Sequence, residues 1–155
     1  MSELKSVVLA VDMATRVRDD AGKVLLRAQR KWRGALDQIE QLESYAADTE
    51  SKWSVTAQVR AVPEAVRNYY QFMDRLQQAI DLQRDVIADL QREIAVAKVA
   101  LLDAEIRIAS LNRLLSKQQT SIGRQQAGRE QRQLDEFAAM QHRRLRLATE
   151  TLETP

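Results

Sequence analysis

The chain has 155 residues, a formal net charge of +2, four glycines, two prolines and no cysteine. So few turn-forming residues exclude a compact fold with many short connections, and the composition is typical of long helices. The lack of cysteine excludes a disulfide framework and a thiolate metal site, and no apolar run approaches the ~20 residues of a membrane span.

The first predicted element is a long helix over about residues 3–57. Apolar and small residues recur at alternating spacings of three and four, which is the heptad pattern of a coiled coil. Large residues stand mainly at the position called a and alanines mainly at the position called d, so a partner helix can approach closely. Gly22 and Gly34 fall inside this pattern at a cost of about 1 kcal/mol each, and we expect the helix to tolerate them because the stripe continues through both. The stripe consists of Val11, Ala14, Arg18, Ala21, Leu25, Ala28, Trp32, Ala35, Ile39, Leu42, Ala46, Thr49 and Trp53.

A turn is predicted at about residues 58–63, where the heptad pattern stops. Pro63 suits the first turn of a new helix, since the missing N–H of proline has no partner there in any case. Glu64 next to it favours the positive start of that helix.

The second predicted helix covers about residues 64–148 and carries a stronger heptad stripe. Nine successive apolar a positions predict a left-handed supercoil. Beyond Ile122 the register fails, so the rest of this helix lacks a partner within the chain. The a positions are Val66, Met73, Ile80, Ile87, Ile94, Leu101, Ile108, Leu115 and Ile122, and the d positions are Tyr69, Leu76, Gln83, Leu90, Ala97, Ala104, Leu111, Gln118 and Gln125.

Two long helices and no strand predict an all-α fold. Because a short turn forces the two helices to be antiparallel, we expect one coiled-coil hairpin over residues 1–155, with the C-terminal helix longer. This alignment puts Tyr45 near Phe72 and Leu25 near Ile94. Tyr45 and Phe72 occupy the g positions that flank the same side of the seam, and exposed aromatics there indicate a docking patch. A residue that only widens the core would give the same pattern.

Catalysis has little support in this sequence. The single histidine, His142, precedes Arg143 and Arg144 on a polar helix end, and it lacks the partners of an acid–base or metal site. We find no phosphate loop or nucleophile motif and therefore expect no enzyme activity, no catalytic residue, no metal, no cofactor and no small-molecule substrate.

Charge is unevenly distributed along the chain. Residues 1–35 hold eight basic and four acidic side chains, residues 36–64 hold two and six, and residues 111–155 hold eight and five. Such basic stretches could bind nucleic acid or anionic lipid, and this remains an alternative. Interspersed acids and the absence of stacking aromatics there favour protein partners and no nucleic acid.

Three motifs resemble the flagellar FliJ family. The stretch Asn68-Tyr-Tyr-Gln-Phe72-Met-Asp-Arg-Leu76-Gln-Gln-Ala79-Ile80 is similar to the signature of that family. The stretch Leu134-Asp-Glu-Phe137-Ala resembles its second motif, and Leu42-Glu-Ser-Tyr45 resembles a third, weaker one.

The resemblance implies a cytoplasmic, non-enzymatic stalk and escort of flagellar type III protein export, peripheral at the inner face of the cell membrane. Its expected partners are the hexameric export ATPase, the cytoplasmic domain of the membrane export-gate protein, and export chaperones. Thr49 and Gln83 depart from the family pattern. A stalk of a virulence secretion system is the alternative, and the Leu134–Phe137 motif favours the flagellar one. The resemblance assigns gate binding to Gln38, Leu42, Tyr45, Phe72, Leu76 and Ala79, and ATPase binding to Leu134, Asp135, Glu136, Phe137, Arg16 and Arg18.

Overall fold

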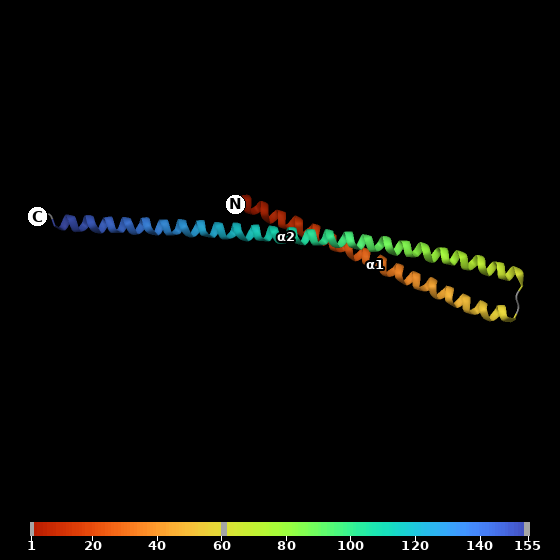
Figure 1. Cartoon of the computed structure of the whole chain (residues 1–155). Helices are drawn as coiled ribbons and strands as arrows, with labels where there is room; N and C mark the ends of the chain where they lie inside the picture. The colour runs from red at the N-terminus through yellow and green to blue at the C-terminus, as the bar shows by residue number, and fades with distance from the viewer. Residues whose placement is uncertain (1, 60–61, 154–155) are drawn as a thin grey trace. The chain divides into compact units, whose positions relative to one another are not determined.

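The protein consists of two α-helices in the computed structural model, which describes residues 2–59 and 62–153. Helix α1 spans Ser2–Val59 and helix α2 spans Pro63–Leu152 (Figure 1). Both begin and end within a few residues of the predicted bounds, and the all-α hairpin with a longer C-terminal helix is confirmed. Residues 60 and 61 of the predicted turn lie outside the described residues.

The start of α2 follows the prediction made from Pro63. This proline is the first helical residue, and the backbone N–H of Val66 donates to the Val62 carbonyl over 3.1 Å. Glu64 lies in the first turn, where its negative charge complements the helix dipole. Pro63 therefore ends the connection and starts α2 without losing a hydrogen bond.

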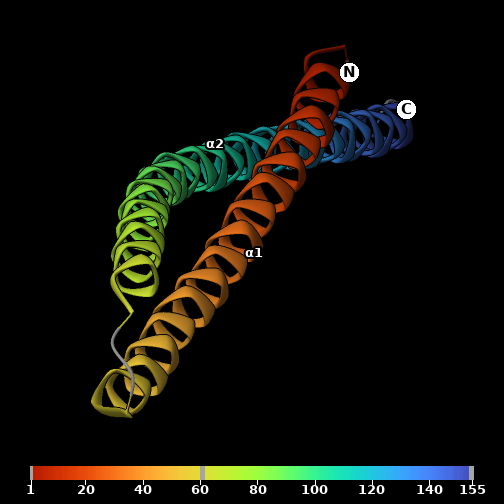
Figure 2. The same ribbon diagram turned by 90° about the vertical axis from the view of Figure 1, so that its right-hand side faces the viewer.

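The chain divides into two compact units, Ala14–Ile106 and Met1–Met13 with Arg107–Pro155. In the Ala14–Ile106 unit α1 and α2 run antiparallel. Two contacts show this: Trp53 stacks on Tyr69 near the turn, and Ala35 accepts a hydrogen bond from Gln83 further from it. Figure 2 shows that the part of α2 that follows the turn, drawn yellow to teal, is curved. Gentle curvature of this kind lets a long helix stay in contact with its neighbour.

The core of the Ala14–Ile106 unit is a thin seam made by the predicted heptad residues. Five alanines at d positions, together with Leu76 and Ile80, are its most deeply buried members: Ala14, Ala28, Ala35, Ala97 and Ala104. Their small side chains let the helices approach closely, as the alternation of large residues and alanine predicts. The heptad register is confirmed, since every predicted a and d residue from Ala14 to Ala104 is buried or half-buried.

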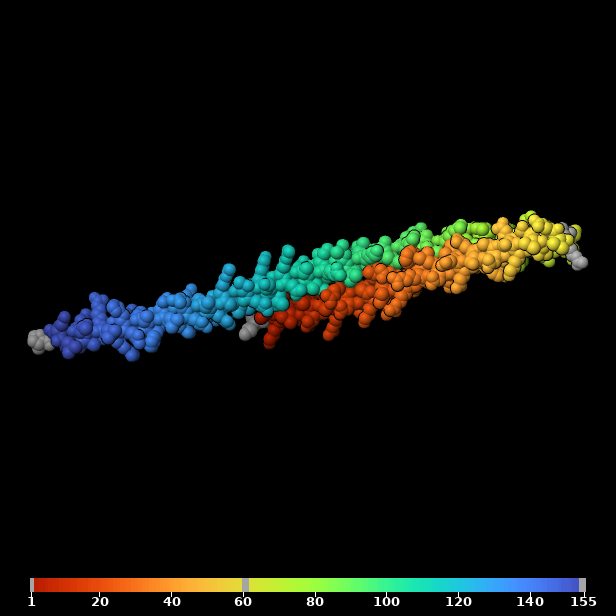
Figure 3. All heavy atoms as spheres, turned by 90° about the horizontal axis from the view of Figure 1, so that it is seen from below, coloured from red at the N-terminus to blue at the C-terminus, as the bar shows by residue number. Residues whose placement is uncertain are grey.

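The second unit has a short paired part and a long unpaired part. Val7 of α1 is 9% exposed, and on α2 the predicted a and d residues from Ile108 to Ile122 are half-buried. Every residue from 123 to 152 is helical and exposed. In Figure 3 the red start of α1 lies against the teal part of α2, and the blue part of α2 has no helix beside it. The predicted loss of register after Ile122 thus marks the end of the seam in this unit.

The four glycines all lie within helices, as predicted for Gly22 and Gly34. A Cβ atom added at any of them would meet no other atom within 4 Å. The helices therefore continue through these glycines, and the packing does not require a glycine at any of them. The handedness of the supercoil and the single-domain organisation stay predictions.

Candidate protein-binding surfaces

Tyr45 of α1 and Phe72 of α2 form an aromatic pair on one side of the seam, as the heptad alignment predicts. Their ring centroids lie 5.9 Å apart and their planes meet at 80°, which is a favourable edge-to-face arrangement. Tyr45 is 56% exposed and Phe72 is 38% exposed. Each ring limits the freedom of the other, so the folded chain presents a preformed aromatic surface to solvent.

The other residues assigned to this surface differ in their exposure. Gln38 is exposed, whereas Leu42 and Ala79 are half-buried. Leu76 is only 8% exposed, so it packs within the seam and supports the surface from behind. A shallow hollow beside the aromatic pair is lined by Gln38, Gln41, Leu42, Tyr45 and Gln83.

Gln83 joins the two helices at the edge of this hollow. Its Nε2 donates to the Ala35 carbonyl over 3.0 Å and to the Gln38 Oε1 atom over 3.1 Å. A polar side chain at a d position commonly fixes the register of a coiled coil. Sequence reasoning placed Gln83 in the seam but did not assign it to the surface. It holds the Gln38 side chain in place there.

Acidic residues of α1 surround Tyr45 on its outer side. Another shallow hollow is lined by Asp37, Glu40, Gln41, Ser44, Tyr45 and Asp48. The negative charge predicted for residues 36–64 therefore lies next to the aromatic pair. Exposed carboxylates close to aromatic rings favour a partner surface that combines apolar and basic groups.

A second aromatic cluster lies nearer the turn and was not assigned to any site. The rings of Trp53 and Tyr69 are stacked, with centroids 4.5 Å apart and planes at 8°. Tyr70, which is 65% exposed, contacts the Tyr69 ring edge-on at 5.5 Å. Burial, followed by the charge of Glu50, raises the pKa of the Tyr69 hydroxyl. The seam positions of Trp53 and Tyr69 were visible in the sequence, whereas their stacking was not.

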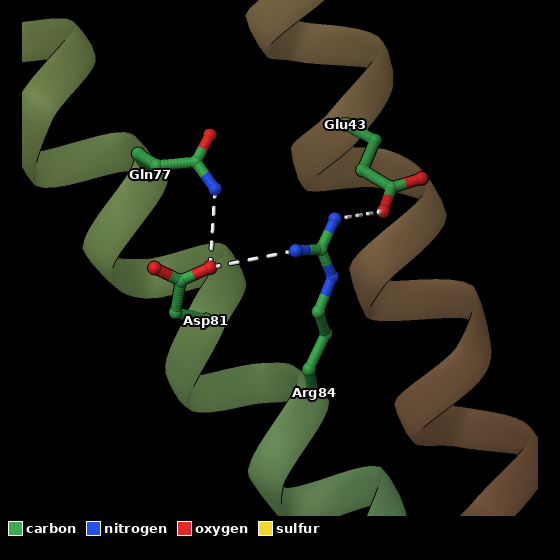
Figure 4. A network of polar contacts seen from close by, with 4 residues as sticks. All are labelled: Glu43, Gln77, Asp81 and Arg84. Atoms are coloured by element: carbon green, nitrogen blue, oxygen red, sulfur yellow. Dashed lines mark hydrogen bonds and ion pairs between the residues drawn. The ribbon is translucent and has the colours of Figure 1, made fainter.

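A polar network on the other side of the seam joins three residues at e positions, Glu43, Gln77 and Arg84, to Asp81. Figure 4 shows Arg84 of α2 between Asp81 on its own helix and Glu43 on α1. The Arg84 guanidinium lies 3.5 Å from Asp81 Oδ1 and 3.6 Å from Glu43 Oε1. Gln77 Nε2 donates to the same Asp81 oxygen over 3.1 Å. These exposed ion pairs contribute little stability, but they give this side a charged character that differs from the aromatic side.

The residues assigned to ATPase binding lie in both units. Leu134 and Phe137 are 63% and 61% exposed on the unpaired part of α2, and Asp135 accepts a 3.2 Å hydrogen bond from Gln131 Nε2. Asp135 and Glu136 are exposed too.

Two arginines of α1 complete that assignment. Arg16 is exposed, and the Arg18 guanidinium lies 3.0 Å from Asp19 Oδ1. Both belong to the Ala14–Ile106 unit.

Among residues 2–59 and 62–153 there is no cluster of three or more potential metal-binding side chains. His142 lies exposed on the unpaired part of α2. Within the same described residues, neither helix contains a stretch apolar enough to cross a membrane.

Comparison with known proteins gives one family for this chain. The sequence profile described as Flagellar FliJ protein matches residues 3–147. Searches among curated proteins and among solved structures found no match. The profile covers both helices and all three motifs that carry the resemblance. Membership implies a non-enzymatic component associated with the flagellar type III export apparatus. On this match the chain belongs to the FliJ family of flagellar proteins.

Proposed function

We propose that the chain is a stalk that connects the hexameric flagellar export ATPase to the cytoplasmic domain of the export-gate protein. The observation that carries this proposal is the unpaired part of α2, residues 123–152, in which every residue is exposed. A long isolated helix gains no packing energy and is only marginally stable in water. An acceptor that surrounds it would supply the missing contacts.

The unpaired part of α2 has the chemistry expected of a segment inserted into a protein ring. It exposes apolar side chains that include Leu134, Phe137, Met140, Leu145 and Leu147. Residues 111–155 also hold eight basic and five acidic side chains. Apolar contacts would give affinity, and the excess of positive charge favours acidic loops in the pore. Such charge attraction between exposed groups weakens as salt rises.

The aromatic surface is proposed to bind the export gate. Tyr45 and Phe72 are held in mutual contact before any partner arrives, so binding loses little side-chain entropy. The adjoining Asp37, Glu40 and Asp48 favour a gate surface with basic groups. Gln38, Leu42 and Ala79 extend the contact along the same side, with Leu76 as support beneath it.

The stalk is proposed to act in the cytoplasm, at the inner face of the cell membrane, and to escort export chaperones as well. A stalk of a virulence secretion system is the alternative. The match to the profile of the flagellar family favours the flagellar system.

Two variants measured against two partners test the proposal. The first combines Tyr45→Ala and Phe72→Ala, and the second ends the chain after Ile122. The first should weaken binding to the gate domain by at least tenfold and leave ATPase binding unchanged. The second should abolish ATPase binding and leave gate binding unchanged. Isothermal titration with each purified partner gives the four affinities.

Two controls accompany these variants. Gln77→Ala removes a side chain from the polar network around Arg84, on the side of the seam away from the aromatic pair. It should leave both affinities unchanged. Circular dichroism establishes that each variant is folded. If either variant loses both partners while it stays helical, the two-ended stalk is wrong.

A further inference from the structure

Helix α2 carries a second apolar stripe over residues 95–106, outside the seam with α1. The seam uses Ile94, Ala97, Leu101 and Ala104, which are buried or half-buried. Ala95, Val99, Leu102 and Ile106 follow one another at spacings of four, three and four, so they share a different face of the helix. We call these four residues the outer stripe.

The outer stripe is exposed to solvent. Val99 is 58% exposed, and Leu102 and Ile106 are each 55% exposed. Ala95 is exposed as well. A helix that is apolar on two opposite faces is normally covered on both. In this unit α1 packs on the seam face of α2, so it does not cover the outer stripe.

The residue types of the outer stripe favour one kind of partner. With Val99 and Ile106 at a positions, Ala95 and Leu102 fall at d positions. Branching at the β carbon at a, combined with leucine at d, favours parallel two-stranded coiled coils. A second copy of α2 in the same register would place each residue opposite its own equivalent.

The charges beside the outer stripe agree with that register. Lys98 occupies the g position before Val99, and Asp103 occupies the following e position. In a parallel pair, g of one helix lies next to the following e of the other. Lys98 of each copy would therefore meet Asp103 of the other copy, twice by symmetry. Arg92, at the preceding a position, is held by Asp89 of its own helix at 2.7 Å, and it limits the apolar contact at that end.

We propose that the outer stripe is a self-association surface through which two copies of the chain pair α2 with α2, parallel and in register. The stripe covers residues 95–106, a length of about 18 Å of helix. That is much less than a standard interface with ~800 Å² buried on each partner. The dimer is accordingly weak, and it forms only at high protein concentration. This proposal does not depend on the stalk function.

Charge exchange tests the register. Lys98→Glu and Asp103→Lys each put like charges together, and each should lower the dimer association constant at least fivefold in sedimentation equilibrium of the full chain. The double variant exchanges the charges and should restore dimerisation to near the native level. A native chain that stays monomeric at every concentration overturns the proposal. A double variant that fails to restore the dimer while it stays helical overturns it too.

Disulfide trapping tests the same pairing independently, because the native chain has no cysteine. Leu102→Cys should form an intermolecular disulfide under mild oxidation, since a parallel register places residue 102 opposite itself. Leu82→Cys is the matched control: Leu82 is 67% exposed but lies off the outer stripe. Selective trapping of the Leu102→Cys variant supports the proposal. Equal trapping of both variants means random collision and overturns it.

Discussion

Two surfaces with exposed aromatic residues in this FliJ-family chain are held in different ways. Tyr45 and Phe72 flank a packed seam and contact each other across it. Phe137 lies on the unpaired part of α2, where every residue is exposed. The first surface is organised by folding, whereas the second has only the helix backbone to organise it. The same residue class can therefore be a preformed docking surface or a segment that awaits its partner.

The largest expected difference between the two regions concerns a charge placed on each. Ile94→Asp puts an unpaired carboxylate into the seam and should lower the free energy of unfolding by roughly 3 kcal/mol. The thermal midpoint should fall by roughly 10 °C. Phe137→Asp places the same charge on the unpaired part of α2 and should leave the midpoint unchanged. Circular dichroism melting curves of both variants measure the contrast. An equal loss in both would mean that the C-terminal region is packed after all.

Glutamines at d positions give a smaller contrast of the same kind. Gln83 is half-buried in the seam and Gln125 is exposed beyond it. Gln83→Leu gives up two hydrogen bonds and adds apolar contact, so the net gain in stability should be about 1 kcal/mol. Gln125→Leu should change stability by much less, because nothing covers that position. Urea unfolding measures both, and a loss of stability in Gln83→Leu would show that its hydrogen bonds outweigh apolar burial.

The heptad repeat predicted the seam well because burial in a coiled coil follows from spacing alone. Together with the short turn, which predicted the antiparallel pairing, it predicted the approach of Tyr45 to Phe72 and the end of the seam at Ile122. Side-chain contacts that depend on rotamers were not predictable in this way. The link from Arg84 to Glu43 and the stack of Trp53 on Tyr69 are of this type.

Two further features show where reasoning from the sequence falls short. Leu76 was assigned to the gate surface by its place in a family motif, yet it is buried in the seam. The outer stripe was missed because one heptad register had already explained α2. Its signal was present in the sequence, as a second set of apolar residues at spacings of three and four.

The contact between Tyr45 and Phe72 should contribute a measurable but modest coupling. An edge-to-face pair is worth about 1 kcal/mol beyond its burial. In a double-mutant cycle, the stability losses of Tyr45→Ala and Phe72→Ala should therefore sum to more than the loss of the double variant, by about that amount. Urea unfolding of the two single variants and the double variant gives the coupling. Purely additive losses would mean that the rings do not support each other, and the surface would then not be preformed.

The smallest expected effect belongs to the unpaired part of α2. Leu134→Ala together with Phe137→Ala removes two large apolar side chains that are more than half exposed. In a packed core such changes cost several kcal/mol, whereas exposed positions usually change stability by less than ~0.5 kcal/mol. Alanine also favours helix more than phenylalanine does, which offsets part of any lost contact. Urea unfolding should therefore match that of the native chain, while affinity for the export ATPase falls. A clear loss of stability would show that these side chains pack within the chain, and a binding role would no longer be needed to explain them.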